Sequence, residues 1–363
     1  MAQPEIWREP VRGGYPEAWM LALPGRERLA RFRRQLNPAP PLTHLTGARP
    51  TGFGDGTADA EMPVSDWLAN DAGLIGGGTL AILADIAFGV AVESRIPAAV
   101  PYTTAELSLT FLRPARPGAT LTGHGQALHV GRTVGLSEVF VLDPRGETLL
   151  AHGTSRLSIL PPVEGLPPEP EDDPEPPAQP DEAEPDPHLR SPPAGAVVPQ
   201  ELWSELSGRE ILERHLRGEL PPPGIHHLTG IAPTEVGEGT ATVRMPATEW
   251  LNSPAGRLQG GAIVMLADTA MATAVLTTAP AGTAVAGLDL KANFLRPVFG
   301  DGAELTATAE VVHRGRTLAI SRARVENAEG KPVLLATGSA MYLPGRPANL
   351  GADVELPAPE DDS

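Results

Sequence analysis

The stretch GGTLAILADIAFGVAV, residues 77–92, recurs as GGAIVMLADTAMATAV at residues 260–275. Both copies open on a glycine pair, contain few polar positions and carry one aspartate, Asp85 or Asp268, seven residues after the second glycine. A helix this apolar is expected to be surrounded by protein on all sides. The two stretches therefore predict two long buried helices.

The similarity extends far beyond these helices, because residues 25–160 recur as residues 208–343. Residues 25–47 and 208–230 are identical at 12 of 23 positions, at a constant displacement of 183. The displacement between the copies changes to 184 at the GRT of residues 131–133, which recurs at residues 315–317. The change falls beside a glycine, and turns that contain glycine tolerate insertions. A duplication of this length predicts two domains of ordinary size.

The rest of the chain differs from the repeats in composition. We expect an N-terminal arm (1–24), a first domain (25–160), an acidic Pro-rich linker (161–200), a second domain (201–343) and an acidic tail (344–363). The linker holds ten acids and one Arg and the tail five acids and one Arg, so most of the net charge of -17 lies outside the domains. Acidic, Pro-rich segments are extended, which predicts a mobile tether between the domains. The arm, with two Trp and no counterpart in the second copy, is expected to pack on a surface.

Composition narrows the classes of function. No basic stripe is present, so we expect no nucleic-acid partner. The chain has no Cys, which excludes thiolate chemistry and disulfides. No uncharged apolar run reaches the ~20 residues that span a bilayer, and the N-terminus does not resemble a signal peptide. We expect no membrane partner, no metal site and a cytoplasmic location.

Strands are predicted after each long helix. Residues 106–111 and 289–294 alternate polar and apolar side chains, which is typical of a half-buried strand. Further strand-like segments cover residues 120–129, 133–142 and 148–159, separated by glycine-containing turns. A short entry helix, one long buried helix and several antiparallel strands in each copy predict an α+β fold.

The glycine pair and the aspartate have different chemical properties. The first-turn N–H groups of a helix lack intrahelical partners and lie at the positive end of its dipole, so they can bind an oxyanion where glycine lets a substrate approach. Asp85 and Asp268 are candidate general bases for water. The alternative is that each Asp hydrogen-bonds a neighbouring element and only closes the core. Its recurrence at one spacing in both copies favours function.

Helix geometry connects the duplication to this chemistry. Seven residues at ~1.5 Å each place the Asp ~10 Å along the helix from its own glycines, too far to act on one carbonyl together. If the two helices pack antiparallel, each Asp comes close to the N-terminus of the other helix. We therefore expect two composite sites between the repeats, Asp85 with Gly260 and Asp268 with Gly77.

The pattern Asn-x-x-Gly-x-x-x-Gly-Gly followed by Leu-x-Asp, then an alternating strand ending in a Pro turn, resembles the hotdog-fold acyl-CoA thioesterases of the phenylacetyl-CoA (PaaI-like) type. The resemblance covers both repeats. It implies a tandem double-hotdog chain, in which a curved antiparallel sheet wraps each long helix and the two domains form an intramolecular pseudo-dimer with active sites between them. It also implies a thioester hydrolase with an acyl-CoA substrate and no cofactor, the coenzyme A moiety being part of the substrate.

The resemblance suggests further site residues by position. One composite site would contain Asp85, Thr104, Ser253, Gln259 and Gly260, and the other Asn70, Gly76, Gly77, Asp268 and Gly287. The hydroxyl that orients water in the family aligns with Thr104, and Gln259 stands where the family often has His. We favour the Asp85 site on this ground. Candidate substrate-binding residues are Gly78 and Gly261, with Arg113, Arg132, Arg296 and Arg316 for the phosphates of coenzyme A.

Two rival functions stay open at this point. Hotdog folds also serve as acyl dehydratases and hydratases that use a His, but all nine His of this chain lie outside the helix-opening motif. A non-catalytic acyl-CoA-binding or sensor protein would have the same fold and use the Asp pair only to close the core. We also expect that two tandem chains could pair as a homo-dimer.

Overall fold

The computed structural model describes residues 4–170, 185–192 and 197–350. The first repeat contains α1 (Gly25–Arg33), α2 (Pro41–Thr46), β1 (Arg49–Phe53), β2 (Thr57–Val64), η3 (Asp66–Leu68), α3 (Gly77–Glu93), β3 (Tyr102–Phe111), β4 (Ala119–Val130), β5 (Val134–Leu142) and β6 (Leu149–Ile159). The part of the linker at 171–184 and 193–196, and the tail from 351 onward, lie outside the described residues.

The second repeat has the same order of elements. It contains α5 (Gly208–Leu216), α6 (Gly224–Thr229), β7 (Ala232–Gly237), β8 (Thr240–Pro246), η5 (Glu249–Leu251), α7 (Gly260–Leu276), β9 (Thr283–Phe294), β10 (Glu304–Arg314), β11 (Leu318–Glu326) and β12 (Pro332–Pro344). Outside the repeats lie η1 (Ile6–Arg8), η2 (Ala18–Ala22), η4 (Pro187–Leu189) and α4 (Gln200–Glu205). The long helices and the strands predicted from the sequence are present. Each long helix extends one residue beyond its predicted end, β3 and β9 begin four and six residues earlier than predicted, and β5 and β6 each begin one residue later.

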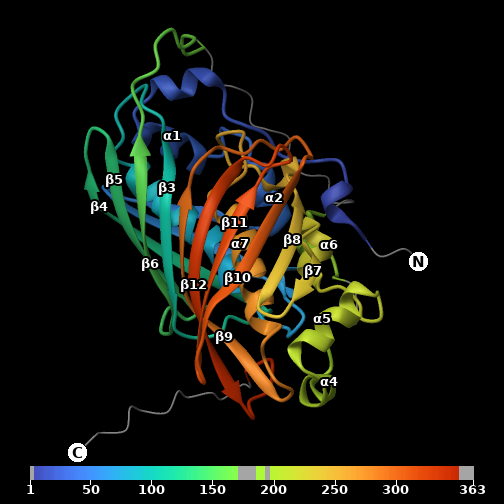
Figure 1. The fold of residues 1–363 in the computed structure, drawn as a ribbon. Helices are drawn as coiled ribbons and strands as arrows, with labels where there is room; N and C mark the ends of the chain where they lie inside the picture. The colour runs from blue at the N-terminus through green and yellow to red at the C-terminus, as the bar shows by residue number, and fades with distance from the viewer. Residues whose placement is uncertain (1–3, 171–184, 193–196, 351–363) are drawn as a thin grey trace, which may run out of the picture.

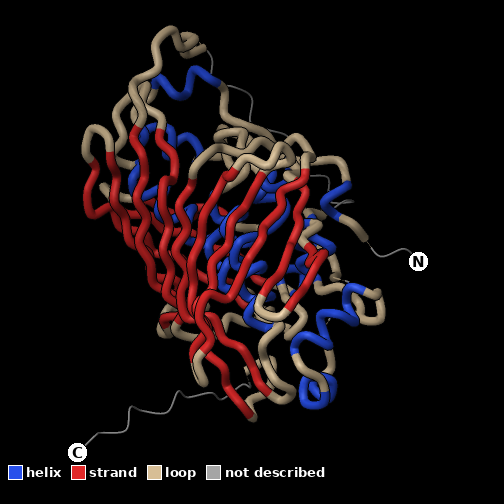
Figure 2. Tube along the Cα trace, viewed as in Figure 1, coloured by secondary structure: helices blue, strands red, loops and turns tan. Residues whose placement is uncertain are grey.

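The strands of both repeats form one antiparallel sheet of 12 strands, in the order β1-β2-β4-β5-β6-β3-β9-β12-β11-β10-β8-β7. Figures 1 and 2 show the sheet curving across the molecule with the helices behind it. The repeats join where β3 pairs with β9, and there Ser108 lies opposite Lys291. These two residues are 183 positions apart, the displacement of the repeat. A pseudo-two-fold axis therefore passes between them.

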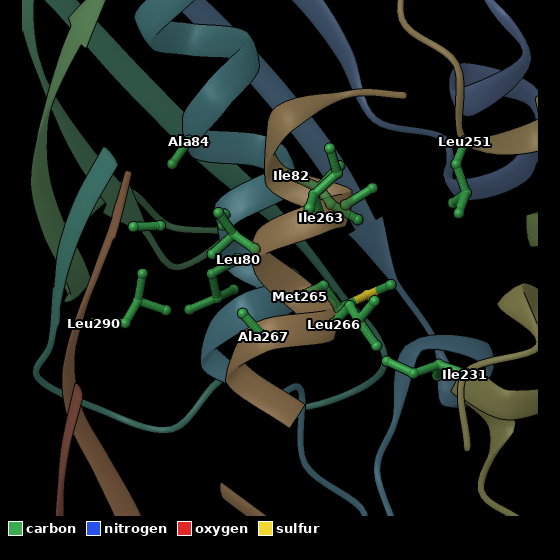
Figure 3. Packing of buried hydrophobic residues seen from close by; sticks show 14 of the residues in the cluster. Leu80, Ile82, Ala84, Ile231, Leu251, Ile263, Met265, Leu266, Ala267 and Leu290 are labelled. Carbon is green, nitrogen blue, oxygen red and sulfur yellow. The ribbon is translucent and has the colours of Figure 1, made fainter. Parts of the chain in front are cut away.

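The two long helices pack against each other on the inner face of the sheet. One buried cluster contains apolar side chains from α3, α7 and the strands of both repeats, and Figure 3 shows α3 and α7 side by side within it. Leu109 of β3 and Leu290 of β9, paired across the junction, are each at most 1% exposed. The core is thus shared between the repeats, which explains why both helices are apolar all round.

Glycine makes the close approach of the helices possible. A Cβ on Gly261 would lie 2.3 Å from the carbonyl oxygen of Ala81, and a Cβ on Gly78 would lie 2.7 Å from the Cα of Met265. The second glycine of each pair is therefore required where the N-terminus of one helix meets the middle of the other.

A β-bulge interrupts each strand at the junction. The register of β3 against β6 shifts between Thr104 and Glu106, and that of β9 against β12 shifts between Gly287 and Asp289. Because one extra residue reverses the side of the sheet to which the following residues point, Thr104 and Gly287 face the helices. The alternation of residues 106–111 alone would have placed Ala105 there.

Part of the linker is packed, which corrects the expectation of a mobile tether for residues 185–190. The carbonyl of Arg190 accepts a hydrogen bond from the Trp67 indole of the first repeat at 2.7 Å. In the N-terminal arm, the carbonyl of Glu9 accepts one from the Trp250 indole of the second repeat at 3.1 Å. Arg190 and Glu9 also form an ion pair at 2.6 Å. The arm therefore has a counterpart in the linker. The arm, which precedes the first repeat, packs on the second repeat, and the linker, which precedes the second repeat, packs on the first.

Candidate active site

Asp85 lies at the N-terminus of α7, as the antiparallel arrangement predicts. Its Oδ2 accepts a hydrogen bond from the N–H of Gly261 at 3.2 Å, and its Oδ1 accepts one from the hydroxyl of Thr104 at 2.9 Å. The side chain is buried, at 8% exposure. Burial raises the pKa of Asp85, while the Thr104 hydroxyl and the N–H groups of Gly261 and Gly260 lower it. The carboxylate is thus held between one repeat's strand and the other repeat's helix.

Asp268 occupies the symmetric position at the N-terminus of α3. Its Oδ2 accepts a hydrogen bond from the N–H of Gly78 at 2.7 Å. Among the residues that the structure describes, no hydroxyl donates to it, because Gly287 stands where Thr104 stands in the first repeat. Burial raises the pKa of Asp268 to about 6, and the Gly78 N–H lowers it by a smaller amount. Asp268 is half-buried, whereas Asp85 is buried at 8% exposure.

The two glycines of each pair have different surroundings. The N–H groups that hydrogen-bond the carboxylates belong to Gly78 and Gly261, the second glycine of each pair. The sequence predicts the first glycines, Gly77 and Gly260, as the oxyanion donors. Within the described ranges, the N–H of Gly77 has no hydrogen-bond acceptor. A first-turn N–H at the positive end of α3 is therefore available to an oxyanion beside Asp268.

Aromatic rings flank both helix N-termini, which the sequence analysis missed. A Cβ on Gly77 would lie 2.5 Å from the ring of Phe111, and one on Gly260 would lie 3.2 Å from the ring of Phe294. These rings end β3 and β9. The FLRP of residues 111–114 and 294–297 was the available signal, since it ends both alternating strands.

Three predicted site residues organise the backbone near the helix N-termini. The Gln259 side chain caps α7 by accepting from the Ala262 N–H at 3.1 Å, and its amide donates to the Ile82 carbonyl at 3.0 Å. The Asn70 side chain accepts two backbone N–H groups within its own turn at 3.0 Å each, and the Ser253 hydroxyl donates to a carbonyl of the equivalent turn at 3.1 Å. These contacts shape the approach to α3 and α7.

The four predicted arginines lie apart from the carboxylates. Arg113 and Arg296 each donate to a backbone carbonyl of the neighbouring strand end, at 3.2 and 2.5 Å. Arg132 is exposed at the β4–β5 turn, and Arg316 lines a cavity of about 170 Å³ with Arg314 and Tyr342. In the described part of the chain, no hydrogen bond or ion pair connects any of these four arginines to Asp85 or Asp268.

A second polar network lies beside Asp85 and was also missed. The Tyr102 hydroxyl donates to Glu93 at 3.0 Å, and Arg28 donates to the other oxygen of Glu93 at 2.8 Å. Burial raises the pKa of Tyr102 well above its usual value, so the phenol stays protonated. This network fills the space between α3 and β3 next to Thr104.

Over residues 4–170, 185–192 and 197–350, no helix is both long enough and apolar enough to cross a bilayer.

Two solved structures align with more than four fifths of this chain. The tesB protein of Mycobacterium avium subs paratuberculosis aligns with 84% of this chain and 98% of its own, at 16% identity and a TM-score of 0.52. A protein of Alicyclobacillus acidocaldarius with a hot dog fold aligns with 83% of this chain and 97% of its own, at 15% identity and a TM-score of 0.51. Both likenesses concern the fold.

Sequence comparison points to one family for both repeats. The acyl-coenzyme A thioesterase PaaI of Escherichia coli is 34% identical over 116 residues, which cover 32% of this chain and 80% of PaaI. A 1,4-dihydroxy-2-naphthoyl-CoA hydrolase of Listeria monocytogenes is 33% identical over 94 residues, covering 26% of this chain and 75% of the hydrolase. The model of the thioesterase superfamily matches twice, at residues 72–150 and 255–334, which span the two long helices and their carboxylates. The chain therefore belongs to the thioesterase superfamily and carries its hotdog fold twice.

Proposed function

We propose that this protein hydrolyses acyl-CoA thioesters to the free acid and coenzyme A, at a composite site between its two repeats. The observation that carries the proposal is that each long helix places its carboxylate at the N-terminus of the other. Asp268 of α7 lies at the N-terminus of α3, and Asp85 of α3 lies at the N-terminus of α7. Each places an acid or base beside first-turn N–H groups, which is the pair of functions that hydrolysis of a thioester needs.

The chemistry at the Asp268 site follows from its geometry. The thioester carbonyl oxygen would accept the free N–H of Gly77, and Asp268 would take a proton from water. The resulting hydroxide forms a bond to the carbonyl carbon, the C–S bond breaks, and the proton passes to the leaving thiolate. One oxyanion donor typically contributes ~3 kcal/mol and base catalysis a further 10²–10⁴-fold. The reaction needs no cofactor, because coenzyme A enters as part of the substrate.

The structure changes which site we favour. The sequence favoured the Asp85 site for its Thr104 hydroxyl and for Gln259. The hydroxyl does bind Asp85, but the Gln259 side chain is engaged with α7 and α3. Asp85 is buried next to the Tyr102 network, whereas Asp268 is half-buried. We therefore propose that Asp268 supports turnover and that Asp85 closes the equivalent site.

The test is release of thiol from a panel of short, medium, long and aryl acyl-CoAs. The parent protein should release thiol, and the double variant Asp85→Asn with Asp268→Asn should not. The matched control is Asp59→Asn, which removes the same charge from an exposed position on β2. Tight binding of acyl-CoA without release by the parent protein would replace the proposal with a non-catalytic acyl-CoA-binding protein.

Other expectations from the sequence stay predictions. These are the cytoplasmic location, the pairing of two tandem chains, and the domain boundaries at residues 25, 161, 201 and 344. A role for Arg132 and Arg316 at the phosphates of coenzyme A is part of the proposal, supported by the exposure of both side chains.

A further inference from the structure

The turn that leads into α3 is packed, whereas the equivalent turn before α7 is exposed. The two turns, residues 70–74 and 253–257, occupy the same positions in the repeats at the displacement of 183. Leu74 of the first turn is buried. At its position the second turn has Arg257, which is exposed with its guanidinium over the ring of Phe299. The N-termini of the two long helices are therefore preceded by turns with different surroundings.

The end of the linker contacts the first turn on one side. The Val198 N–H donates to the carbonyl of Asp71 at 2.9 Å. Val197 lies 3.4 Å from where a Cβ on Gly73 would be. Ala72 packs against the buried apolar cluster that contains Val198. Three consecutive residues of the turn thus contact the segment that connects the two repeats.

The segment after β12 contacts the same turn. Leu350 forms a buried apolar cluster with Leu74 and with Ala284 of β9. The φ of Leu350 is 57°, a left-handed conformation that leucine rarely adopts. Such a conformation persists only where the surroundings hold the residue in place. The Ala348 N–H donates to the side-chain oxygen of Gln200 at 2.9 Å, which joins this segment to the end of the linker.

We call residues 197–203 and 348–350, which contact the first turn from the linker and from the segment after β12, the turn cover. The second turn has no equivalent among the described residues. There, no backbone N–H of the described chain donates to the carbonyl of Pro254, and Ala255 is exposed. Apart from its chain neighbours, no described atom comes within 4 Å of where a Cβ on Gly256 would be. One turn of the duplicated pair is therefore held from outside and the other is not.

The covered turn is directly connected to the proposed oxyanion donor. A bridge between Ala69 and Ile75 ties the two ends of the turn together. Only Gly76 separates Ile75 from Gly77, where α3 begins. A displacement of the turn is therefore passed to the first N–H of α3, beside Asp268.

We propose that the turn cover positions the Gly77 N–H for the reaction at the Asp268 site, and that Val198 and Leu350 are positioning residues. The inference rests on the proposed function, because the Gly77 N–H acts only on a reacting carbonyl. It also gives the two sites different support. The turn before α3 serves Asp268 and is covered, whereas the turn before α7 serves Asp85 and is exposed.

The first measurement is thiol release from a medium-chain acyl-CoA by Leu350→Asp, which introduces a charge into the cluster with Leu74. We expect kcat to fall by about 10–100-fold, because a small misplacement of a reacting group has an effect of this size. KM should stay unchanged, because an oxyanion donor acts mainly on the transition state. Leu350→Met keeps an apolar side chain of similar volume and should restore kcat.

The matched control is Arg257→Asp, which introduces the same side chain at the position equivalent to Leu74 in the second turn. We expect it to leave kcat unchanged. A normal kcat in Leu350→Asp would overturn the proposal. So would a rise of KM alone, or a loss of kcat of the same size in Arg257→Asp.

Hydrogen exchange tests the turn cover without turnover. The backbone amides of residues 70–77 and 253–260 are followed by mass spectrometry of the full chain. In Leu350→Asp we expect exchange at 70–77 to become at least about tenfold faster, because segments that lose buried apolar contacts open locally. Exchange at 253–260 should not change. Unchanged exchange at 70–77, or an equal increase in both segments, would overturn the proposal. Faster exchange at 70–77 alone, in a protein that releases no thiol, would remove the proposed function and retain the turn cover as the element that holds the N-terminus of α3.

Discussion

Replacing Asp268 by Asn is expected to stabilise the protein above pH 6 and to leave its stability near pH 4 unchanged. Burial raises the pKa of Asp268 to about 6 from an ordinary value of 3.8. Between these two pH values the folded state binds more protons than the unfolded chain. Stability that the neutral side chain provides below pH 4 is therefore lost as the pH rises through 6. A neutral amide avoids this loss and can still accept the Gly78 N–H.

The magnitude follows from the pKa shift. About two pKa units correspond to about 3 kcal/mol, and we expect about 2 kcal/mol because a half-buried side chain is partly screened by solvent. For a chain of this size that is a rise of about 3 °C in the thermal midpoint. The assay is thermal unfolding of the parent and Asp268→Asn from pH 4 to pH 8. An equal difference between the two proteins at both ends of this range would refute the reasoning, because it would show that the charge of Asp268 is not penalised by burial.

Three further predictions concern the catalytic carboxylate, the packing of the two long helices and the binding of coenzyme A. The kcat/KM for an acyl-CoA should rise with pH to a plateau above an apparent pKa near 6, because Asp268 must be ionised to take a proton; a profile flat from pH 5 to 8 would exclude Asp268 as the base. Gly261→Ala should destabilise the fold by about 1–3 kcal/mol in urea unfolding, because its Cβ would lie 2.3 Å from the Ala81 carbonyl oxygen. The control is Gly287→Ala, whose Cβ would meet nothing closer than 3.7 Å, and an equal loss of stability in the two variants would contradict the packing argument. Arg132→Glu and Arg316→Glu should raise KM for acyl-CoA with little change in kcat, and KM values that stay unchanged would remove both residues from the substrate site.

Much of the fold is predictable from residues that repeat. The apolar stretches that begin at Gly77 and Gly260 predict the two central helices. The seven-residue spacing to Asp85 and Asp268 predicts that each carboxylate reaches the other helix. Both inferences depend on helix geometry, which is the same in every protein. They therefore hold without knowledge of the surroundings.

The parts that the sequence did not reveal depend on contacts between distant segments. A bulge adds one residue to a strand without changing its composition, so the inward direction of Thr104 and Gly287 could not be predicted from alternation. The acidic linker has the composition of a tether, yet the carbonyl of Arg190 binds the Trp67 indole. That contact involves a backbone group, which leaves no trace in composition.

A further difference concerns Gln259, a side chain with two possible sets of partners. Gln259 was expected to face the substrate, but its side chain satisfies an N–H of the first turn of α7 and a carbonyl of α3 instead. The glycine N–H that meets each carboxylate is the second of its pair, because close helix packing brings Gly78 and Gly261 nearest to the opposite helix. Sequence spacing cannot distinguish neighbouring residues in a helix turn.

The most direct test of the account compares Asp85→Asn and Asp268→Asn in thiol release from a medium-chain acyl-CoA. The chain contains no Cys, so a thiol-reactive dye reports only the released coenzyme A. We predict that Asp268→Asn lowers kcat by at least about 10²-fold and that Asp85→Asn retains kcat within a few-fold of the parent. Loss of turnover in Asp85→Asn with normal turnover in Asp268→Asn would contradict the account and assign the reaction to the Thr104 site.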